Sequence, residues 1–171
     1  MKNTKYITFS AILSALSVVI LILGAVFGVL DLTAVFIASI FLLIAREEMG
    51  WGAFGIYFVT LAIALLLPNT TVAAIEYAII AIFPIFRPAI ERLNVVLKWF
   101  IKVLYMLLAA GGIFVISRIL VADAPLYADI LLAVGSLLIL FLYDVLLFRF
   151  MMYYRFRLRN RLRIDRFFNQ F

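Results

Sequence analysis

The run Ile7–Val29, ITFSAILSALSVVILILGAVFGV, decides the fold of this chain. It contains no charged residue and is long enough to cross the hydrocarbon layer of a membrane as one helix. The rest of the 171-residue sequence has the same character, with 68% hydrophobic residues, 14% charged residues and a mean hydropathy of +1.24. A soluble domain cannot bury so much apolar surface in one core, so the sequence predicts a membrane protein.

Further apolar runs, separated by charged or turn-forming residues, predict an all-α membrane protein with six transmembrane helices. Residues 1–154 form this transmembrane domain, and residues 155–171 form a basic C-terminal tail. No small-residue cleavage site follows the basic start, so the first helix is expected to stay in the protein. The predicted helices are Ile7–Val29, Leu32–Ala45, Trp51–Leu67, Thr71–Phe86, Val95–Leu120 and Leu126–Tyr153.

The basic residues fix the predicted orientation. With six helices, all of the 15 Lys and Arg residues except Arg118 fall on one side of the membrane. The positive-inside rule then puts both termini in the cytoplasm of a cell, with the chain as a multi-pass protein of the plasma membrane. The net charge of +6 lies beside apolar helices, which favours the lipid bilayer and not nucleic acid as its partner.

Several residue types and motifs on which catalytic and metal sites depend are missing from this sequence. The chain has no Cys and no His, which excludes disulfides, thiol chemistry, imidazole metal sites and histidine acid–base catalysis. A glycine-rich phosphate loop and a cluster of metal ligands are also missing. We therefore expect no enzyme activity, no metal and no bound cofactor.

Asp144 and Lys102 are charged residues within predicted spans, and they lie at similar depths on the last two helices. Buried charges in a membrane are costly and usually have a partner. A pair between Lys102 and Asp144 would lower that cost. It predicts either a structural brace between the two helices or part of a proton or ion relay.

Polar residues gather at the predicted outer ends of the helices. Glu76 stands out because apolar residues flank it on its helix. The group is either a set of solvated helix ends or a vestibule for a solute, with Glu76 as the best single contact. The residues of this predicted vestibule are Asp31, Asn69, Glu76, Tyr77 and Asp129.

Two surface features remain. Ala11 and Ala15 have the small-xxx-small spacing that lets helices approach closely in lipid, either within the chain or with a partner. The tail alternates Arg with apolar residues from Arg155 onward. It is expected to lie against anionic headgroups or to bind a cytoplasmic partner.

The segment Phe9–Val19 resembles the first helix of the substrate-binding S components of energy-coupling-factor (ECF) transporters, in which an Ala-xxx-Ala motif contacts a membrane coupling subunit. Ala11 and Ala15 occupy the matching positions. Three more segments, 28–34, 76–93 and 142–145, resemble an S-component-like group of uncharacterised bacterial membrane proteins. Residues that vitamin-binding S components use for their ligands have no match in this sequence.

The resemblance implies a six-helix S-component bundle in a bacterial plasma membrane. Such a subunit captures a small solute from outside and docks through its first helix on a coupling subunit, while partner ATPases hydrolyse ATP. It leaves the solute unknown. Two alternatives stay open: a non-transporting membrane scaffold or regulator that works through the basic tail, and a small ion-coupled carrier based on Glu76 and Asp144.

Overall fold

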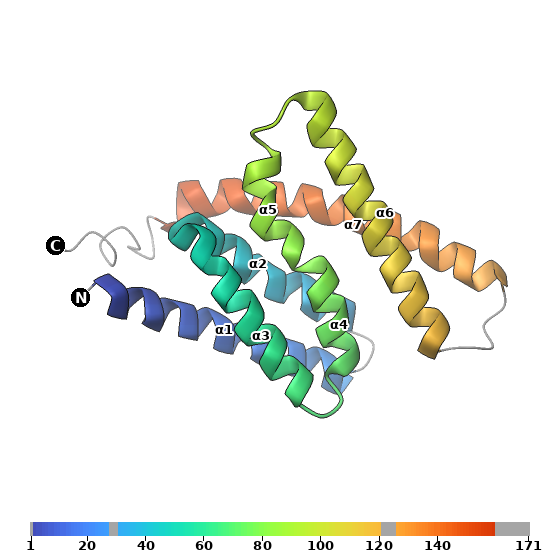
Figure 1. Ribbon diagram of the computed structural model, residues 1–171, viewed down its shortest axis with the longest axis horizontal. Coiled ribbons are helices and arrows are strands. Elements are labelled where there is room, and N and C mark those ends of the chain that lie inside the picture. Colours follow the sequence, from blue (N-terminus) through green and yellow to red (C-terminus); the bar gives the residue numbers. More distant parts are fainter. Residues whose placement is uncertain (1, 28–30, 121–125, 160–171) are drawn as a thin grey trace. The chain divides into compact units, whose positions relative to one another are not determined.

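The computed structural model describes residues 2–27, 31–120 and 126–159, and every element in these ranges is a helix (Figure 1). The predicted all-helical class is therefore confirmed for the described residues. The elements are α1 (Lys2–Phe27), α2 (Asp31–Met49), the 3-10 helix η1 (Gly50–Gly52), α3 (Ala53–Leu66), α4 (Thr71–Ile80), α5 (Ile82–Ile90), α6 (Val95–Leu120), α7 (Leu126–Tyr153) and the π-helical η2 (Tyr154–Leu158).

Long apolar helices make the chain compatible with a multi-pass membrane protein. Within the described residues, five stretches are long and apolar enough to cross a membrane. One of them, Leu32–Leu66, contains two helices, because η1 separates α2 from α3 and the chain reverses its direction there (Figure 1). Gly50, with φ of 61°, supplies the left-handed backbone conformation that this reversal uses. The other stretches are Thr4–Phe27, Thr71–Ile90, Val95–Val115 and Val134–Leu158.

The chain divides into two compact units. The first unit comprises Met1–Ile85 and Leu147–Phe171, and the second comprises Phe86–Leu146. In the first unit, α1 packs against α2 and α3, and α2 also packs against α4 (Figure 1).

Small side chains let α1 and α2 approach each other. Ser17 and Ala38 are fully buried, and the Ser17 hydroxyl lies 3.4 Å from the carbonyl oxygen of Ala38. Ala34, one turn earlier on α2, is also buried. Small residues thus line this α1–α2 contact. In lipid the hydrophobic effect does not drive helices together, and the close van der Waals packing that small residues allow holds them instead.

The predicted helix Thr71–Phe86 is wrong in its bounds. The structure divides it at Ala81 into α4 and α5, and α5 continues to Ile90. Pro84 has no N–H to donate to the carbonyl of Ile80, so the α-helical ladder is interrupted there. Pro84 itself fits within the first turn of α5, where a missing N–H is tolerated. By contrast, α6 and α7 have the bounds that the sequence predicts.

Candidate functional site

Four charged side chains converge in the second unit, where α5 ends and α6 and α7 pass. The Lys102 ammonium lies 2.8 Å from Asp144 Oδ2 and 2.6 Å from Glu91 Oε1. Arg87 Nε lies 2.9 Å from Asp144 Oδ1, and Arg87 Nη2 donates to the main-chain oxygen of Asp144 at 3.3 Å. Arg87, Lys102 and Asp144 are all buried. We call Arg87, Glu91, Lys98, Lys102 and Asp144 the ion cluster.

Glu91 forms the exposed edge of the ion cluster. Besides Lys102, its carboxylate has Lys98 Nζ at 3.4 Å and Arg87 Nη2 at 3.6 Å. The cluster thus combines three cations with two carboxylates. Each carboxylate oxygen of Asp144 already accepts a hydrogen bond from a cation. These charge-assisted hydrogen bonds form a structural brace that holds α5, α6 and α7 together within this unit. A relay would need a carboxylate that is free to exchange its proton, so the geometry favours the brace.

The sequence predicted one pair of this cluster and missed the rest. Lys102 and Asp144 form the predicted ion pair. Arg87 lies just beyond the predicted helix Thr71–Phe86, but it is buried with 5% of its surface exposed. The signal that could have found it is the spacing of Arg87 and Glu91, four residues apart on one helical face, once α5 is extended beyond Pro88.

Glu91 makes the stability of the second unit depend on pH. Burial raises the pKa of the Glu91 carboxyl, but the hydrogen bond from Lys102 and the charges of Lys102, Arg87 and Lys98 outweigh it and hold the pKa below its ordinary value of 4.5. A lowered pKa in the folded state means that stability is present above pH 4.5 and is lost as the pH falls below it. We expect Glu91→Gln to lower the melting temperature near neutral pH, and the difference from the wild type to shrink on acidification. Thermal unfolding in detergent across this pH range measures it, and a difference that stays constant with pH would contradict it.

The face of α1 that carries Ala11 and Ala15 points away from the rest of the first unit. Both alanines are exposed, whereas Leu13, Ser17 and Leu21 on the opposite face are buried. Among the described residues, the two alanines therefore take no part in the packing of α1 on α2 and α3. This placement disfavours the intramolecular reading of their spacing and leaves the pair available to lipid or to a partner helix.

The predicted vestibule is only partly described. Asn69, with φ of 64°, lies in the turn between α3 and α4 and lines a hollow of about 350 Å³. The side chains of Asp31 and Asp129 lie outside the described residues. The other lining residues of this hollow are Ile22, Ala25, Val26, Pro68 and Thr70.

Tyr77 and Glu76 do not line the hollow at Asn69. Tyr77 is fully buried, and its ring stacks on that of Tyr57 with 5.8 Å between the centroids. The Tyr57 hydroxyl donates to the carbonyl of Ala78 at 2.9 Å, which fixes this pair between α3 and α4. Tyr77 is thus a core residue in this structure, and Glu76, its neighbour on α4, is half-buried.

Two acidic residues in the last turn of α2 bind the start of the tail in the first unit. The Arg155 guanidinium binds the Glu47 carboxylate through two nitrogens, with Nε 2.7 Å from Oε1 and Nη2 2.9 Å from Oε2. The Tyr154 hydroxyl donates to Glu48 at 2.9 Å, and Arg159 Nε lies 3.2 Å from the same oxygen. The predicted helix Leu32–Ala45 ends before Glu47 and Glu48, and nothing in the local sequence indicates that residues more than a hundred positions later return to them.

Comparison with known proteins gives no match: no family model, curated protein or solved structure is significantly similar to this chain.

Proposed function

We propose that this chain is the substrate-specificity subunit of an ECF-type importer, which captures a small solute outside the cell and docks on a membrane coupling subunit through α1. The observation that carries the proposal is the exposure of Ala11 and Ala15 on a helix whose other face is buried. Small residues that a chain does not use for its own packing allow a second helix to approach closely in lipid. The resemblance of Phe9–Val19 to the first helix of S components supports the same role.

The proposal counts six membrane crossings. The apolar stretch Leu32–Leu66 contributes two of them, because η1 turns the chain back on itself. All Lys and Arg residues except Arg118 then lie on one side, and the positive-inside rule puts both termini in the cytoplasm. The ATPases and the coupling subunit would act from that side, since ATP is hydrolysed by partners and not by this chain.

The hollow at Asn69 is the proposed place for the solute. It lies at the end of α3 opposite to η1, which is the outer side in this orientation. Its volume of about 350 Å³ falls within the range of small-molecule sites. Ile22, Ala25 and Val26 give it an apolar wall, and Asn69 and Thr70 give it hydrogen-bonding groups. The chemistry suits a small, mostly apolar solute with a few polar atoms.

Replacing both Ala11 and Ala15 by Leu tests the proposed docking. The added side chains would separate the two helices, and overpacking of this kind costs about 1–3 kcal/mol at each position. We expect about tenfold or greater loss of the coupling subunit and the ATPase pair from a mild-detergent pull-down of the tagged chain from its native membrane.

Ala62→Leu is the matched control, because Ala62 is an exposed alanine on α3 and receives the same substitution. It should leave co-purification unchanged. The proposal is wrong if the double variant assembles as well as the wild type, or if the wild type brings no ATPase pair with it.

A further inference from the structure

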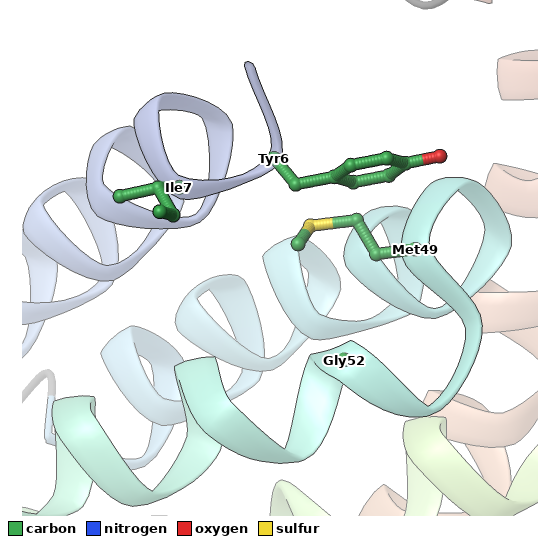
Figure 2. Close-up of a pocket in the computed structure, with 4 residues that line it drawn as sticks. All are labelled: Tyr6, Ile7, Met49 and Gly52. Atoms are coloured by element: carbon green, nitrogen blue, oxygen red, sulfur yellow. The ribbon is translucent and has the colours of Figure 1, made fainter. Parts of the chain in front are cut away.

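An apolar groove lies where α1 begins and α2 ends. It has a volume of about 470 Å³ and is lined by Tyr6, Ile7, Met49 and Gly52. Figure 2 shows Tyr6 and Ile7 on α1, Met49 at the end of α2 and Gly52 in η1. None of these four residues is charged, and Ile7 is 66% exposed. The groove thus presents an apolar surface to an occupant.

The described part of the chain ends beside this groove, in the same unit. Its last residue is Arg159, whose Nε lies 3.2 Å from Oε1 of Glu48, and Glu48 directly precedes the lining residue Met49. The Tyr154 hydroxyl donates to the same carboxylate oxygen at 2.9 Å. Both Tyr154 and the Glu48 side chain are buried, so this attachment is protected from water. The end of the described chain is therefore held next to the groove.

The sequence that follows Arg159 contains large apolar side chains within reach of the groove. It reads NRLRIDRFFNQF over residues 160–171 and includes Phe167, Phe168 and Phe171. Phe167 and Phe168 come eight and nine residues after Arg159. An extended chain covers about 3.3–3.6 Å per residue, so these two residues can reach roughly 26–32 Å from Arg159. Because the groove begins at the residue after Glu48, it lies within this range.

The lining of the groove favours an aromatic occupant. The Met49 thioether can contact the edge of an aromatic ring, and the Tyr6 ring can pair with a second ring; both contacts are favourable. A segment that is tethered beside the groove also has an effective concentration of about the millimolar range. Apolar contacts that are too weak to hold a free peptide are therefore enough to hold this segment.

We propose that the C-terminal segment 160–171 folds back on the first unit and buries the Phe167–Phe168 pair in this groove. The segment then forms a strap that joins the end of η2 to the start of α1 and the end of α2. This strap is independent of the proposed transport function, because it needs neither a solute nor a coupling subunit.

Cross-linking of introduced cysteines tests the strap, because the chain has no Cys of its own. Gly52→Cys places a thiol in the groove. The chain should accept it, since Gly52 has a helical φ of −59° and a Cβ there would meet Met49 Cβ at an ordinary 3.4 Å. Asn169→Cys places the second thiol directly after Phe168. We expect a short bismaleimide to join the two thiols within one full-length chain in vesicles of phosphatidylcholine and phosphatidylglycerol, as measured by mass spectrometry of the intact protein.

The two phenylalanines should account for this cross-link. Phe167→Ser with Phe168→Ser, made in the two-cysteine chain, should lower the initial rate of cross-linking about tenfold or more, because the burial of each ring is lost. Arg161→Ser with Arg163→Ser is the matched control. It replaces two large residues of the same segment by serine and keeps both rings, so the rate should stay unchanged.

The proposal is overturned if no cross-link forms within the chain, or if the phenylalanine variant reacts as fast as its parent. It is also overturned if the rate depends on the two arginines and not on the phenylalanines, which would mean that charge holds the segment against anionic lipid. Cross-links that form only between two chains would assign the groove to a second copy and would equally overturn it. Ile7→Cys, on the exposed side of the groove, replaces Gly52→Cys if that variant fails to fold.

Discussion

Asp144→Ala should destabilise the protein by about 3–5 kcal/mol, the usual result of removing one partner from a buried ion pair. The Asp144 carboxylate accepts from Arg87 at 2.9 Å and from Lys102 at 2.8 Å. Its loss would leave both buried cations without that charge. Lys102 would keep Glu91 at 2.6 Å, but Glu91 is 30% exposed and would then have to balance three cations alone. Thermal or denaturant unfolding in detergent measures the loss.

Two further variants separate the charge of Asp144 from its volume. Asp144→Asn keeps the side-chain size and an acceptor oxygen, so we expect an intermediate loss of stability. The triple variant Arg87→Met, Lys102→Met, Asp144→Leu removes every buried charge of the cluster, and Glu91 keeps Lys98 as its partner. Replacement of a whole buried ion group by apolar residues is often neutral or stabilising, so the triple variant should recover most of the stability. A triple variant as unstable as Asp144→Ala would contradict the explanation by uncompensated charge.

The ion cluster also bears on the carrier alternative. A carboxylate that carries protons or ions through a cycle must lose and regain its partners, whereas both oxygens of Asp144 are held by buried cations. The contacts that stabilise the ion cluster therefore also make Asp144 less accessible to a transported ion. The structure therefore makes Asp144 a poor centre for ion coupling and a good brace.

Helix bounds were predictable where the local sequence marks both ends of the helix. The bounds of α6 and α7 agree with the sequence because unbroken apolar runs lie between polar or turn-forming residues, such as Asn94 before α6. The α4–α5 region was not predictable in the same way. The predicted helix ends at Phe86, but Pro84 falls in the first turn of α5, where its missing N–H is tolerated, and the helix continues past Pro88.

Contacts between distant parts of the chain were harder to predict. The depth of Lys102 and Asp144 within their helices was enough to suggest their pairing. Arg87 was missed because its burial depends on the extension of α5. The binding of Arg155 to Glu47 was missed because it depends on the return of η2 to the end of α2.

The α1–α2 contact shows a similar limit of the sequence. Ala11 and Ala15 carry the visible small-xxx-small spacing, yet both are exposed. Ala34 and Ala38 have the same spacing on α2, and both are buried. The spacing of small residues alone does not show which of them face the protein, because a helix in lipid carries apolar residues on all of its faces. The exposure of Ala11 and Ala15 points to a surface for lipid or a partner only once Ala34 and Ala38 are known to be the buried pair.

Ala38→Leu should therefore be among the most damaging apolar substitutions in the first unit. Ala38 is fully buried, and its carbonyl oxygen lies 3.4 Å from the Ser17 hydroxyl, so a larger side chain would have to push α1 away from α2. Overpacking of a close contact costs about 1–3 kcal/mol and sometimes more. Unfolding in detergent should show this loss as a lower melting temperature.

Ala15→Leu is the matched comparison, because it makes the same change on the exposed face of α1. Surface substitutions usually change stability by no more than about 0.5 kcal/mol, so this variant should unfold like the wild type. Equal damage from the two changes would mean that the exposed face of α1 is needed for folding of the chain itself. If Ala38→Leu alone unfolds the protein, then a loss of partner binding in Ala15→Leu can be assigned to the interface and not to a damaged fold.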